Sequence, residues 1–401
     1  MQQLGDRFDI HGLGFRPGRG PAPQTGELAG WPLHVQPTSH VFVADPAWLC
    51  GHMQTVAPHA ALVIGPAVLA APLLRQLQPY RARCRLVLYL PVEGELTNAD
   101  ITQTLQLADG CVLYTNHAKR NVASLCDASG CRSPLLGVAG HGIDTRCFFP
   151  LDAQGRGAVR RRLFPNHAAL HDAFLVLNVN RAYQRKRLDL TIAGFARFAR
   201  ERPDAWLYLH VCALSRHEDA AVRGWIAQSC VGGRILLNAL NPDGTLLDIE
   251  QLNLLYNASD VGVTTAMGEG WGLGTFEHAA TGAAQIVPDH TSFRENWQGA
   301  AELLPPVARE HIFYEFADMF VVSPDDVAAS LARLHADAVY RRRMADAAFR
   351  RATEPRFRWN AVADSVAAFL WNVIEAPSCN AGALESALLP GPTVPISALR
   401  G

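Results

Sequence analysis

A glycine-rich segment near residue 270 carries the residue types best suited to chemistry in this chain. Residues 268–282 read Gly-Glu-Gly-Trp-Gly-Leu-Gly-Thr-Phe-Glu-His-Ala-Ala-Thr-Gly, and Glu269 and Glu277 flank the glycines. Glycine has no Cβ, so backbone N–H groups in such a loop can approach a ligand closely. We expect a helix to begin near Thr275, and its free N–H groups and positive dipole end would attract phosphate or sugar oxygens. Together with carboxylates that accept hydrogen bonds from hydroxyl groups, the segment favours a ligand that contains both phosphate and sugar. The alternative is a strand–turn–helix junction with two solvated glutamates.

A second polar cluster follows the predicted strand 174–179. Residues 178–187 read Asn-Val-Asn-Arg-Ala-Tyr-Gln-Arg-Lys-Arg. Ligands of open α/β sheets bind at the carboxyl ends of the strands, so cations at this turn would point into the crevice. A diphosphate needs fixed positive charge around it. Of the 36 Lys and Arg residues only Lys119 and Lys186 are lysine, and Lys186 lies in this turn. A solvated basic turn is the alternative. Lys119 is expected at the surface, with contact to the acceptor as the alternative.

The two clusters together resemble a known family. Glu269 and Glu277 are separated by seven residues, and the segment continues Glu-His-Ala-Ala-Thr-Gly-Ala-Ala-Gln-Ile-Val-Pro. This pattern resembles the Glu-x7-Glu signature of the retaining glycosyltransferases of family 4, which have the GT-B architecture. Arg181 and Lys186 match an Arg and a Lys that the family places five apart. Residues 140–150, Gly-His-Gly-Ile-Asp-Thr-Arg-Cys-Phe-Phe-Pro, resemble the family's linker between its two Rossmann-like domains.

The resemblance covers most of residues 85–375 and implies a reaction. A hexose would move from a nucleotide-diphosphate sugar to a glycan, lipid-linked or small-molecule acceptor with retention of configuration, and no metal or other cofactor would take part. The resemblance implies catalytic roles for Arg181 and Lys186, which would bind the diphosphate, and for Glu269, which would orient a sugar hydroxyl. The donor-binding residues that it implies are Glu277 for the ribose, the amides of Gly272, Leu273 and Gly274 for phosphate and sugar oxygens, and Asn180.

The first half of the chain departs from the family pattern. Many members carry a histidine after the strand that here is 86–90, whereas this chain reads Pro-Val-Glu-Gly-Glu at 91–95. Glu93, Glu95 and His141 are therefore the acceptor-side candidates, with surface or turn positions as the alternative. No catalytic base is assigned, since the leaving phosphate can itself accept the acceptor's proton.

Apolar strand-like runs alternate with helical patterns along the chain, which is typical of parallel α/β sheets. The expected strands are 61–64, 86–90, 111–115, 134–138, 174–179, 205–211, 234–238, 261–265, 285–287 and 302–304. The expected helices are 66–78, 98–108, 116–128, 187–201, 216–229, 249–258 and 275–281, with a further helix capped by Ser323. The predicted fold class is α/β of GT-B type, with two facing Rossmann-like domains and a helix that crosses back to the first. We expect an N-terminal domain with its linker at 1–150, a nucleotide-sugar-binding domain at 151–356, a crossover helix at 357–375 and a disordered tail at 376–401.

The N-terminal domain is expected to lack its first unit. Residues 6–14 resemble the family's second strand, and the Gly- and Pro-rich stretch 14–30 is expected to form a loop. A missing strand–turn–helix unit would leave an apolar sheet edge uncovered beside the cleft. We therefore expect that the start of the chain was placed too far downstream, with a binding or partner-dependent module as the alternative.

Composition and residue content limit the partners and the kinds of site that this chain is expected to have. The chain has 401 residues, 49% of them hydrophobic, and a net charge of −1, so neither nucleic acid nor a charged membrane surface is an expected partner. The nine cysteines form no Cys-x-x-Cys pair, and no signal peptide precedes them, so we expect free thiols and a cytoplasmic protein, with peripheral contact to the inner membrane face left open.

There is no Gly-Lys dipeptide for a P-loop, no Gly-x-Gly-x-x-Gly motif for a dinucleotide, and no His/Cys cluster for a metal. A catalytically silent GT-B module and a nucleotide-sugar epimerase are the remaining alternatives. The sugar, the nucleobase, the acceptor and the oligomeric state stay open.

Overall fold

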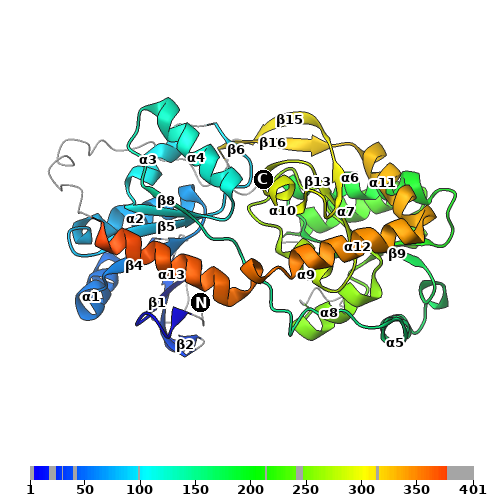
Figure 1. The fold of residues 1–401 in the computed structure, drawn as a ribbon, viewed down its shortest axis with the longest axis horizontal. Coiled ribbons are helices and arrows are strands. Elements are labelled where there is room, and N and C mark those ends of the chain that lie inside the picture. The colour runs from blue at the N-terminus through cyan, green and yellow to red at the C-terminus, as the bar shows by residue number, and fades with distance from the viewer. Residues whose placement is uncertain are drawn as a thin grey trace.

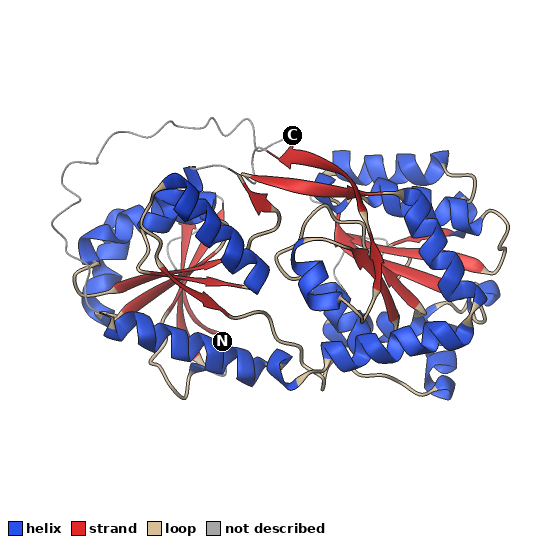
Figure 2. Ribbon diagram, turned by 45° about the horizontal axis from the view of Figure 1, so that its top comes forward, coloured by secondary structure: helices blue, strands red, loops and turns tan. Residues whose placement is uncertain are grey.

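Two lobes, each a parallel β-sheet between layers of helices, make up the molecule (Figure 2). The computed structural model describes residues 4–17, 24–28, 30–38, 43–97, 100–212, 215–240, 247–312 and 316–376. The expected tail 376–401 lies outside these ranges except for its first residue.

The second lobe is built on six parallel strands in the order β11-β10-β9-β12-β13-β14. The strands are β9 (Phe174–Arg181), β10 (Ala205–Cys212), β11 (Ile235–Leu237), β12 (Val261–Val263), β13 (Ala284–Pro288) and β14 (Glu302–Leu304). The helices of this lobe are α5 (Ala153–Leu163), α6 (Leu188–Ala199), α7 (Arg216–Gln228), α8 (Ile249–Ala258), α9 (Leu273–Ala280), α10 (Thr291–Trp297), α11 (Pro324–Ala336) and α12 (Ala338–Ala352). Central strands such as β12 are buried along their whole length, as expected for a sheet with helices on both faces.

The first lobe has four parallel strands in the order β4-β5-β7-β8. These are β4 (Ala60–Ile64), β5 (Arg85–Leu90), β7 (Gly110–Leu113) and β8 (Leu135–Val138), and the helices beside them are α1 (Pro46–Val56), α2 (Ala67–Leu77), α3 (Asp100–Gln106) and α4 (Asn116–Ser129). All ten strands expected from the apolar runs exist, and the predicted α/β GT-B fold class is confirmed.

Local capping explains where several helices begin. The Ser323 side chain accepts a hydrogen bond from the N–H of Asp325, and Pro324 occupies the first helical position of α11, as its sequence predicts. Helix α8 begins with a capping box in which Asp248 and Gln251 each satisfy the other's backbone N–H. These caps hold the helix N-termini that follow the sheet strands.

Helix α13 (Trp359–Glu375) crosses from the second lobe to the first, as Figure 1 shows in orange-red. It packs on β5, β7 and β8. Two glycines make room for it: a Cβ on Gly137 would lie 2.2 Å from the Phe369 ring, and one on Gly110 would lie 2.6 Å from Val373. The predicted crossing helix therefore completes the cover of the first sheet.

A small sheet joins the two lobes, and the sequence patterns did not predict it. Strands β15 (Pro306–Ile312) and β16 (Ala317–Val322) form a hairpin that reaches from the second lobe. The two-residue strand β6 (Glu95–Leu96) of the first lobe pairs antiparallel with β16. The loop after β5 is thereby fixed to the second lobe (Figure 1).

The N-terminal residues form a separate mixed sheet in the order β1-β3-β2. Its strands are β1 (Gly12–Pro17), β2 (Gln24–Leu28) and β3 (Trp31–Thr38). The expectation of a loop throughout 14–30 is wrong, because residues up to Pro17 belong to β1, which pairs parallel with β3, and Gln24–Leu28 pairs antiparallel with β3. None of these strands joins the four-stranded sheet, so β4 is an edge strand, and Ile64 at its end is 43% exposed. Among the described residues up to 60 there is no strand–glycine turn–helix unit in that sheet.

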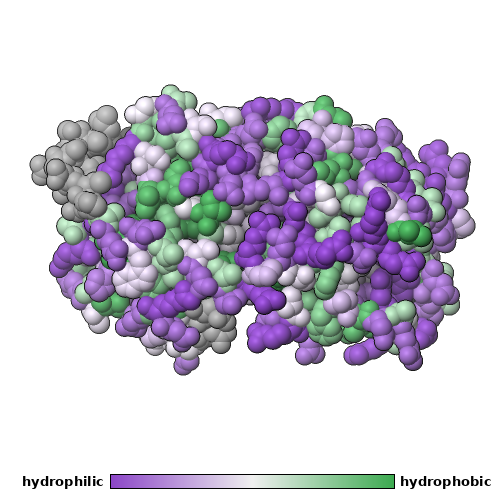
Figure 3. All heavy atoms as spheres, viewed as in Figure 1, coloured by the Kyte–Doolittle hydropathy of each residue, from purple (hydrophilic) through white to green (hydrophobic). Residues whose placement is uncertain are grey.

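Three further observations concern the surface, the helices and the cysteines. The face in Figure 3 is mostly hydrophilic over the second lobe, while apolar side chains gather over part of the first. Within the described ranges no helix combines the length and apolar character needed to span a bilayer. The eight cysteines in those ranges are all free, as expected, and Cys379 lies outside them.

Candidate functional site

A cavity of about 430 Å³ lies between the lobes, at the carboxyl ends of β9 and β12. Its walls come from the basic turn after β9, the glycine-rich segment before α9 and the ends of first-lobe strands. The polar residues that line it include Glu93, Tyr114, His141, Asn180, Arg181, Arg185, Lys186, Thr264, Glu269 and His278. The two sequence clusters, almost 90 residues apart, therefore meet at one site.

The glycine-rich segment ends in a helix N-terminus at the cavity wall. Gly272 adopts a left-handed φ of 91°, which suits glycine, and serves as the N-cap of α9. Helix α9 therefore begins at Leu273, two residues before the predicted start near Thr275. The first N–H groups of a helix have no acceptor within it, and Leu273 and Gly274 line the cavity. This arrangement is suited to binding an anion.

The basic turn presents three cations to the cavity, namely Arg181, Arg185 and Lys186. Lys186, whose side chain is 8% exposed, forms an ion pair with Glu269 of the glycine-rich segment. Arg181 is exposed at the end of β9, and among the described residues it has no carboxylate partner. Asn180 is half-buried beside them and donates a hydrogen bond to Asn178 (2.9 Å). Arg187 turns away and pairs with Asp189.

Arg185 is the cation that the sequence patterns did not single out. Its side chain is 12% exposed, and its guanidinium forms a 2.6 Å ion pair with Glu93 of the first lobe. It also donates to the carbonyl oxygen of Gly268 (2.9 Å) and lies 3.8 Å from a Glu269 carboxylate oxygen. Its place in a run of three basic residues was the only sequence signal.

Glu277 lies in the middle of α9, next to the cavity but not among the residues that line it. It accepts a 2.8 Å hydrogen bond from the hydroxyl of Tyr256, a residue of α8 that does line the cavity. Burial raises the pKa of Glu277 to about 6, against the opposing effect of the Tyr256 hydrogen bond. A carboxylate held in this way can accept further hydrogen bonds but is costly to ionise.

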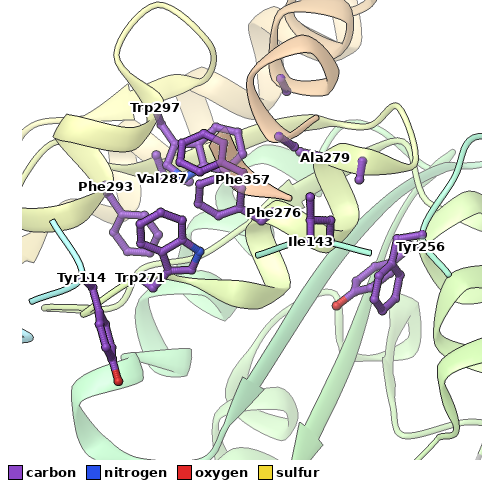
Figure 4. Close-up of a cluster of buried hydrophobic side chains, with 14 of the residues drawn as sticks. Tyr114, Ile143, Tyr256, Trp271, Phe276, Ala279, Val287, Phe293, Trp297 and Phe357 are labelled. Carbon is purple, nitrogen blue, oxygen red and sulfur yellow. The ribbon is translucent and has the colours of Figure 1, made fainter. Parts of the chain in front are cut away.

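Trp271, which lines the cavity, belongs to a buried cluster of aromatic side chains. Trp271 stacks on Phe276 with ring centroids 4.8 Å apart, and Phe357 meets both rings edge-on (Figure 4). Gly140 of the linker allows this packing, since a Cβ there would lie 2.3 Å from the Trp271 ring. The linker and the glycine-rich segment are thus in direct contact.

His141 lies inside the cavity, against Tyr114 of the first lobe at a centroid separation of 4.4 Å. Burial lowers its pKa to about 4, so the imidazole is neutral at physiological pH. A neutral imidazole can donate or accept a hydrogen bond but supplies no fixed charge.

The two first-lobe candidates, Glu93 and Glu95, lie in different places. Glu93 lines the cavity, whereas Glu95 lies in β6, forms an ion pair with Arg309 (3.0 Å) and faces a second hollow. Lys119 is exposed on α4, as expected. In the described part of the chain no three His, Cys, Asp or Glu side chains are placed to hold a metal ion.

A further carboxylate ties the lobes together near the cavity. Glu295 of α10 accepts hydrogen bonds from the backbone N–H groups of Asn116 (2.9 Å) and His117 (2.6 Å). It therefore caps the N-terminus of α4 from the opposite lobe. The segment 91–97 and this cap hold the lobes in contact on the far side from α13.

No known family model matches this chain, and no curated protein matches it in sequence. Solved structures match its fold. A sucrose-phosphate synthase from Thermosynechococcus elongatus superposes with a TM-score of 0.71 at 15% identity, over 93% of this chain and 90% of that one. Anabaena HepE in complex with UDP and glucose gives 0.65 at 16% identity, over 86% and 87%. The pneumococcal O-GlcNAc transferase GtfA in complex with UDP and GlcNAc gives 0.61 at 15% identity, over 82% of this chain, which spans 60% of GtfA. At such identities the likeness establishes the shared fold.

Proposed function

We propose that this protein is a glycosyltransferase that moves a sugar from a nucleotide-diphosphate donor to an acceptor bound by the first lobe. The observation that carries the proposal is the meeting of three cations with the α9 N-terminus around one cavity. Fixed positive charge and backbone N–H groups that converge on one space are what a diphosphate leaving group requires.

Each donor group has a candidate partner. Arg181 and Lys186 would bind the diphosphate, and the amides of Gly272, Leu273 and Gly274 would take phosphate and sugar oxygens. Glu269 faces the cavity and is suited to orient a hydroxyl of the transferred sugar. Glu277 would accept hydrogen bonds from the ribose, and Asn180 would support the phosphate end.

The finer assignments follow from the family resemblance. A hexose donor, membership of family 4, retention of configuration and independence from a metal belong to the proposal. Arginine and lysine would neutralise the leaving group in place of a metal ion. The leaving phosphate would accept the acceptor's proton, and His141, which is neutral, would contribute hydrogen bonding on the acceptor side.

Structural neighbours support the donor class. HepE and GtfA were each solved with UDP and a sugar bound. For this chain we propose the same chemical class of donor, a nucleotide-diphosphate sugar, with the nucleobase open among uracil, guanine and adenine. The acceptor would be a glycan, a lipid-linked sugar or a small molecule.

Turnover of nucleotide sugars distinguishes the alternatives. The protein would be incubated with UDP-, GDP- and ADP-sugars, and the products separated by chromatography. Release of nucleoside diphosphate with sugar transfer or slow hydrolysis is the expected result. An isomerised nucleotide sugar would identify an epimerase, and binding without turnover would identify a catalytically silent module. A thermal shift measures that binding, since a ligand at a hundred times its dissociation constant adds about 2.7 kcal/mol of stability.

The chain's two lysines offer a matched pair of variants for the site. Lys186→Ala should weaken binding of a free nucleoside diphosphate by roughly ten- to a hundredfold, because a charge-assisted hydrogen bond contributes about 1.5–3 kcal/mol. Lys119→Ala removes the same charge from an exposed position on α4 and should leave binding unchanged. Equal behaviour of the two variants would contradict the assignment of Lys186.

A further inference from the structure

Arg185 connects three segments that surround the cavity. Its backbone oxygen accepts a hydrogen bond from Met267 N–H (2.7 Å), and its guanidinium donates to the Gly268 carbonyl oxygen (2.9 Å). The same guanidinium forms the 2.6 Å ion pair with Glu93. Arg185 therefore holds the basic turn and the glycine-rich segment together and reaches across to the first lobe.

The loop that carries Glu93 is wedged between two parts of the second lobe. A Cβ on Gly268 would lie 1.9 Å from the Glu93 carbonyl oxygen, so the two backbones are in direct contact. A Cβ on Gly94 would lie 2.6 Å from the carbonyl oxygen of Asp318 on β16. The backbone of this loop is thus fixed, and its carboxylate is delivered to the cavity beside Arg185.

Charge in the cavity is balanced almost evenly when no ligand is bound. Three cations (Arg181, Arg185 and Lys186) and two carboxylates (Glu93 and Glu269) line it. The histidines that line it are neutral, because burial lowers the pKa of His141 to about 4 and that of His278 to about 3. The net charge of the lining is therefore +1 with Glu93 and would be +2 without it.

Resting on the proposed function, we infer that Glu93 competes with the donor diphosphate for the guanidinium of Arg185. A carboxylate and a phosphate oxygen offer this group the same acceptor geometry. When a nucleotide-diphosphate sugar enters, Arg185 exchanges Glu93 for phosphate. Glu93 is then released on the first-lobe side of the cavity, where the acceptor binds, so donor binding precedes rearrangement of the acceptor side.

A supporting role for Glu93 predicts the opposite sign. If the carboxylate only held Arg185 in position for the phosphate, its loss would weaken binding. If it competes, its loss strengthens binding. The direction of one affinity change therefore separates the two roles.

The test measures binding of free UDP, GDP and ADP by isothermal titration calorimetry at fixed ionic strength. Glu93→Gln keeps the shape of the side chain and removes its charge, and it should bind the nucleoside diphosphate about three- to tenfold more tightly. A tenfold change corresponds to about 1.4 kcal/mol. Arg185→Gln should weaken binding at least tenfold, and adding Glu93→Gln to it should change nothing further. Such a cycle isolates the coupling between the two side chains.

Glu295→Gln is the matched control. It alters another carboxylate that joins the lobes but does not line the cavity, so affinity should stay within about twofold of the wild type. Glu93→Ala is a second variant with the same expected sign, and far-UV circular dichroism checks that each protein is folded.

The outcomes separate this inference from the proposed function. If the wild type binds none of the three nucleotides, both are overturned. If it binds one and Glu93→Gln binds that nucleotide equally or more weakly, the competition alone is overturned. Tighter binding by Glu93→Gln in the Arg185→Gln background as well would assign the effect to general electrostatics and overturn the role of Arg185.

Discussion

Replacing Glu277 by glutamine should stabilise the ligand-free protein at pH 8 but not at pH 4. Burial raises the pKa of this carboxyl from its ordinary value of 4.5 to about 6, although the Tyr256 hydrogen bond opposes the shift. One pKa unit corresponds to about 1.4 kcal/mol, so the shift corresponds to roughly 2 kcal/mol of lost stability once the group is ionised in both states. Glutamine has the same shape, can still accept a hydrogen bond from Tyr256, and does not titrate.

The sign of the pH dependence follows from which state binds more protons. Below about pH 4.5 the carboxyl is protonated in both the folded and the unfolded protein, and burial of its charge costs nothing. Between about pH 4.5 and pH 6 the unfolded chain ionises first, so folding becomes less favourable as the pH rises. Above about pH 6 the full cost is present. The stability difference between Glu277→Gln and the wild type should therefore appear within this window.

Urea denaturation of both proteins between pH 4 and pH 8 measures this difference. We expect a gain of about 2 kcal/mol for the variant at pH 8 and none at pH 4. Glu302→Gln is a control of opposite sign. Burial alone would raise the pKa of Glu302, but hydrogen bonds from Arg333 and Tyr340 lower it more strongly. Its ionised form therefore stabilises the fold above the unfolded pKa and loses that effect as the pH falls, so Glu302→Gln should be less stable at pH 8. A Glu277→Gln protein that is no more stable than the wild type at pH 8, or equally stabilised at both pH values, would refute the reasoning.

Three further outcomes are expected. Nucleoside diphosphate affinity should fall more steeply below about pH 6 for the wild type than for Glu277→Gln, because Glu277 becomes protonated there in addition to the ligand's terminal phosphate, whose second pKa is about 6. Binding titrations of both proteins over this pH range measure the difference. Glu269→Gln should lower turnover without weakening nucleotide binding, because under the proposed function its carboxylate would contact the transferred sugar, whose charge changes in the transition state. Equal losses in both measurements would count against this role. Gly137→Ala should lower the stability by about 1–3 kcal/mol, since its Cβ would overlap the Phe369 ring. Gly224→Ala has open space around it and should raise the stability slightly. Thermal unfolding of the two variants measures the difference.

The parts of the fold that local sequence could predict are those in which one segment decides its own structure. Each strand of the two large sheets is a short apolar run bounded by turn residues, and burial on both faces demands that composition. The start of helix α11 is predictable from Ser323, its N-cap, and Pro324, its first residue. The missed elements depend on distant partners. Strand β6 has two residues and pairs with β16, more than 200 residues further on. Strand β15 is almost wholly exposed, and its sequence Pro-Val-Ala-Arg-Glu-His-Ile does not alternate between apolar and polar residues.

The candidate site likewise has parts that the sequence could predict and parts that it could not. Its two clusters could be predicted to meet, because the carboxyl ends of neighbouring parallel strands share one edge of the sheet. The direction of each side chain in the basic turn could not be predicted. Arg185, Lys186 and Arg187 are consecutive, yet the first two enter the cavity and Arg187, at φ 46°, turns to Asp189. Only the folded structure distinguishes them, and it adds Arg185 to the site.

The crossing of α13 has a consequence for how the chain matures during synthesis. The first sheet is complete in sequence at β8, but the helix that covers one of its faces ends at Glu375. A ribosome adds about 5–20 residues per second, so on the order of ten to fifty seconds separate the two events. During that interval the glycine-lined face of the nascent first lobe has no cover and is open to chaperones or to misassembly. The half of the molecule that is synthesised first is therefore the half that reaches its final packing last.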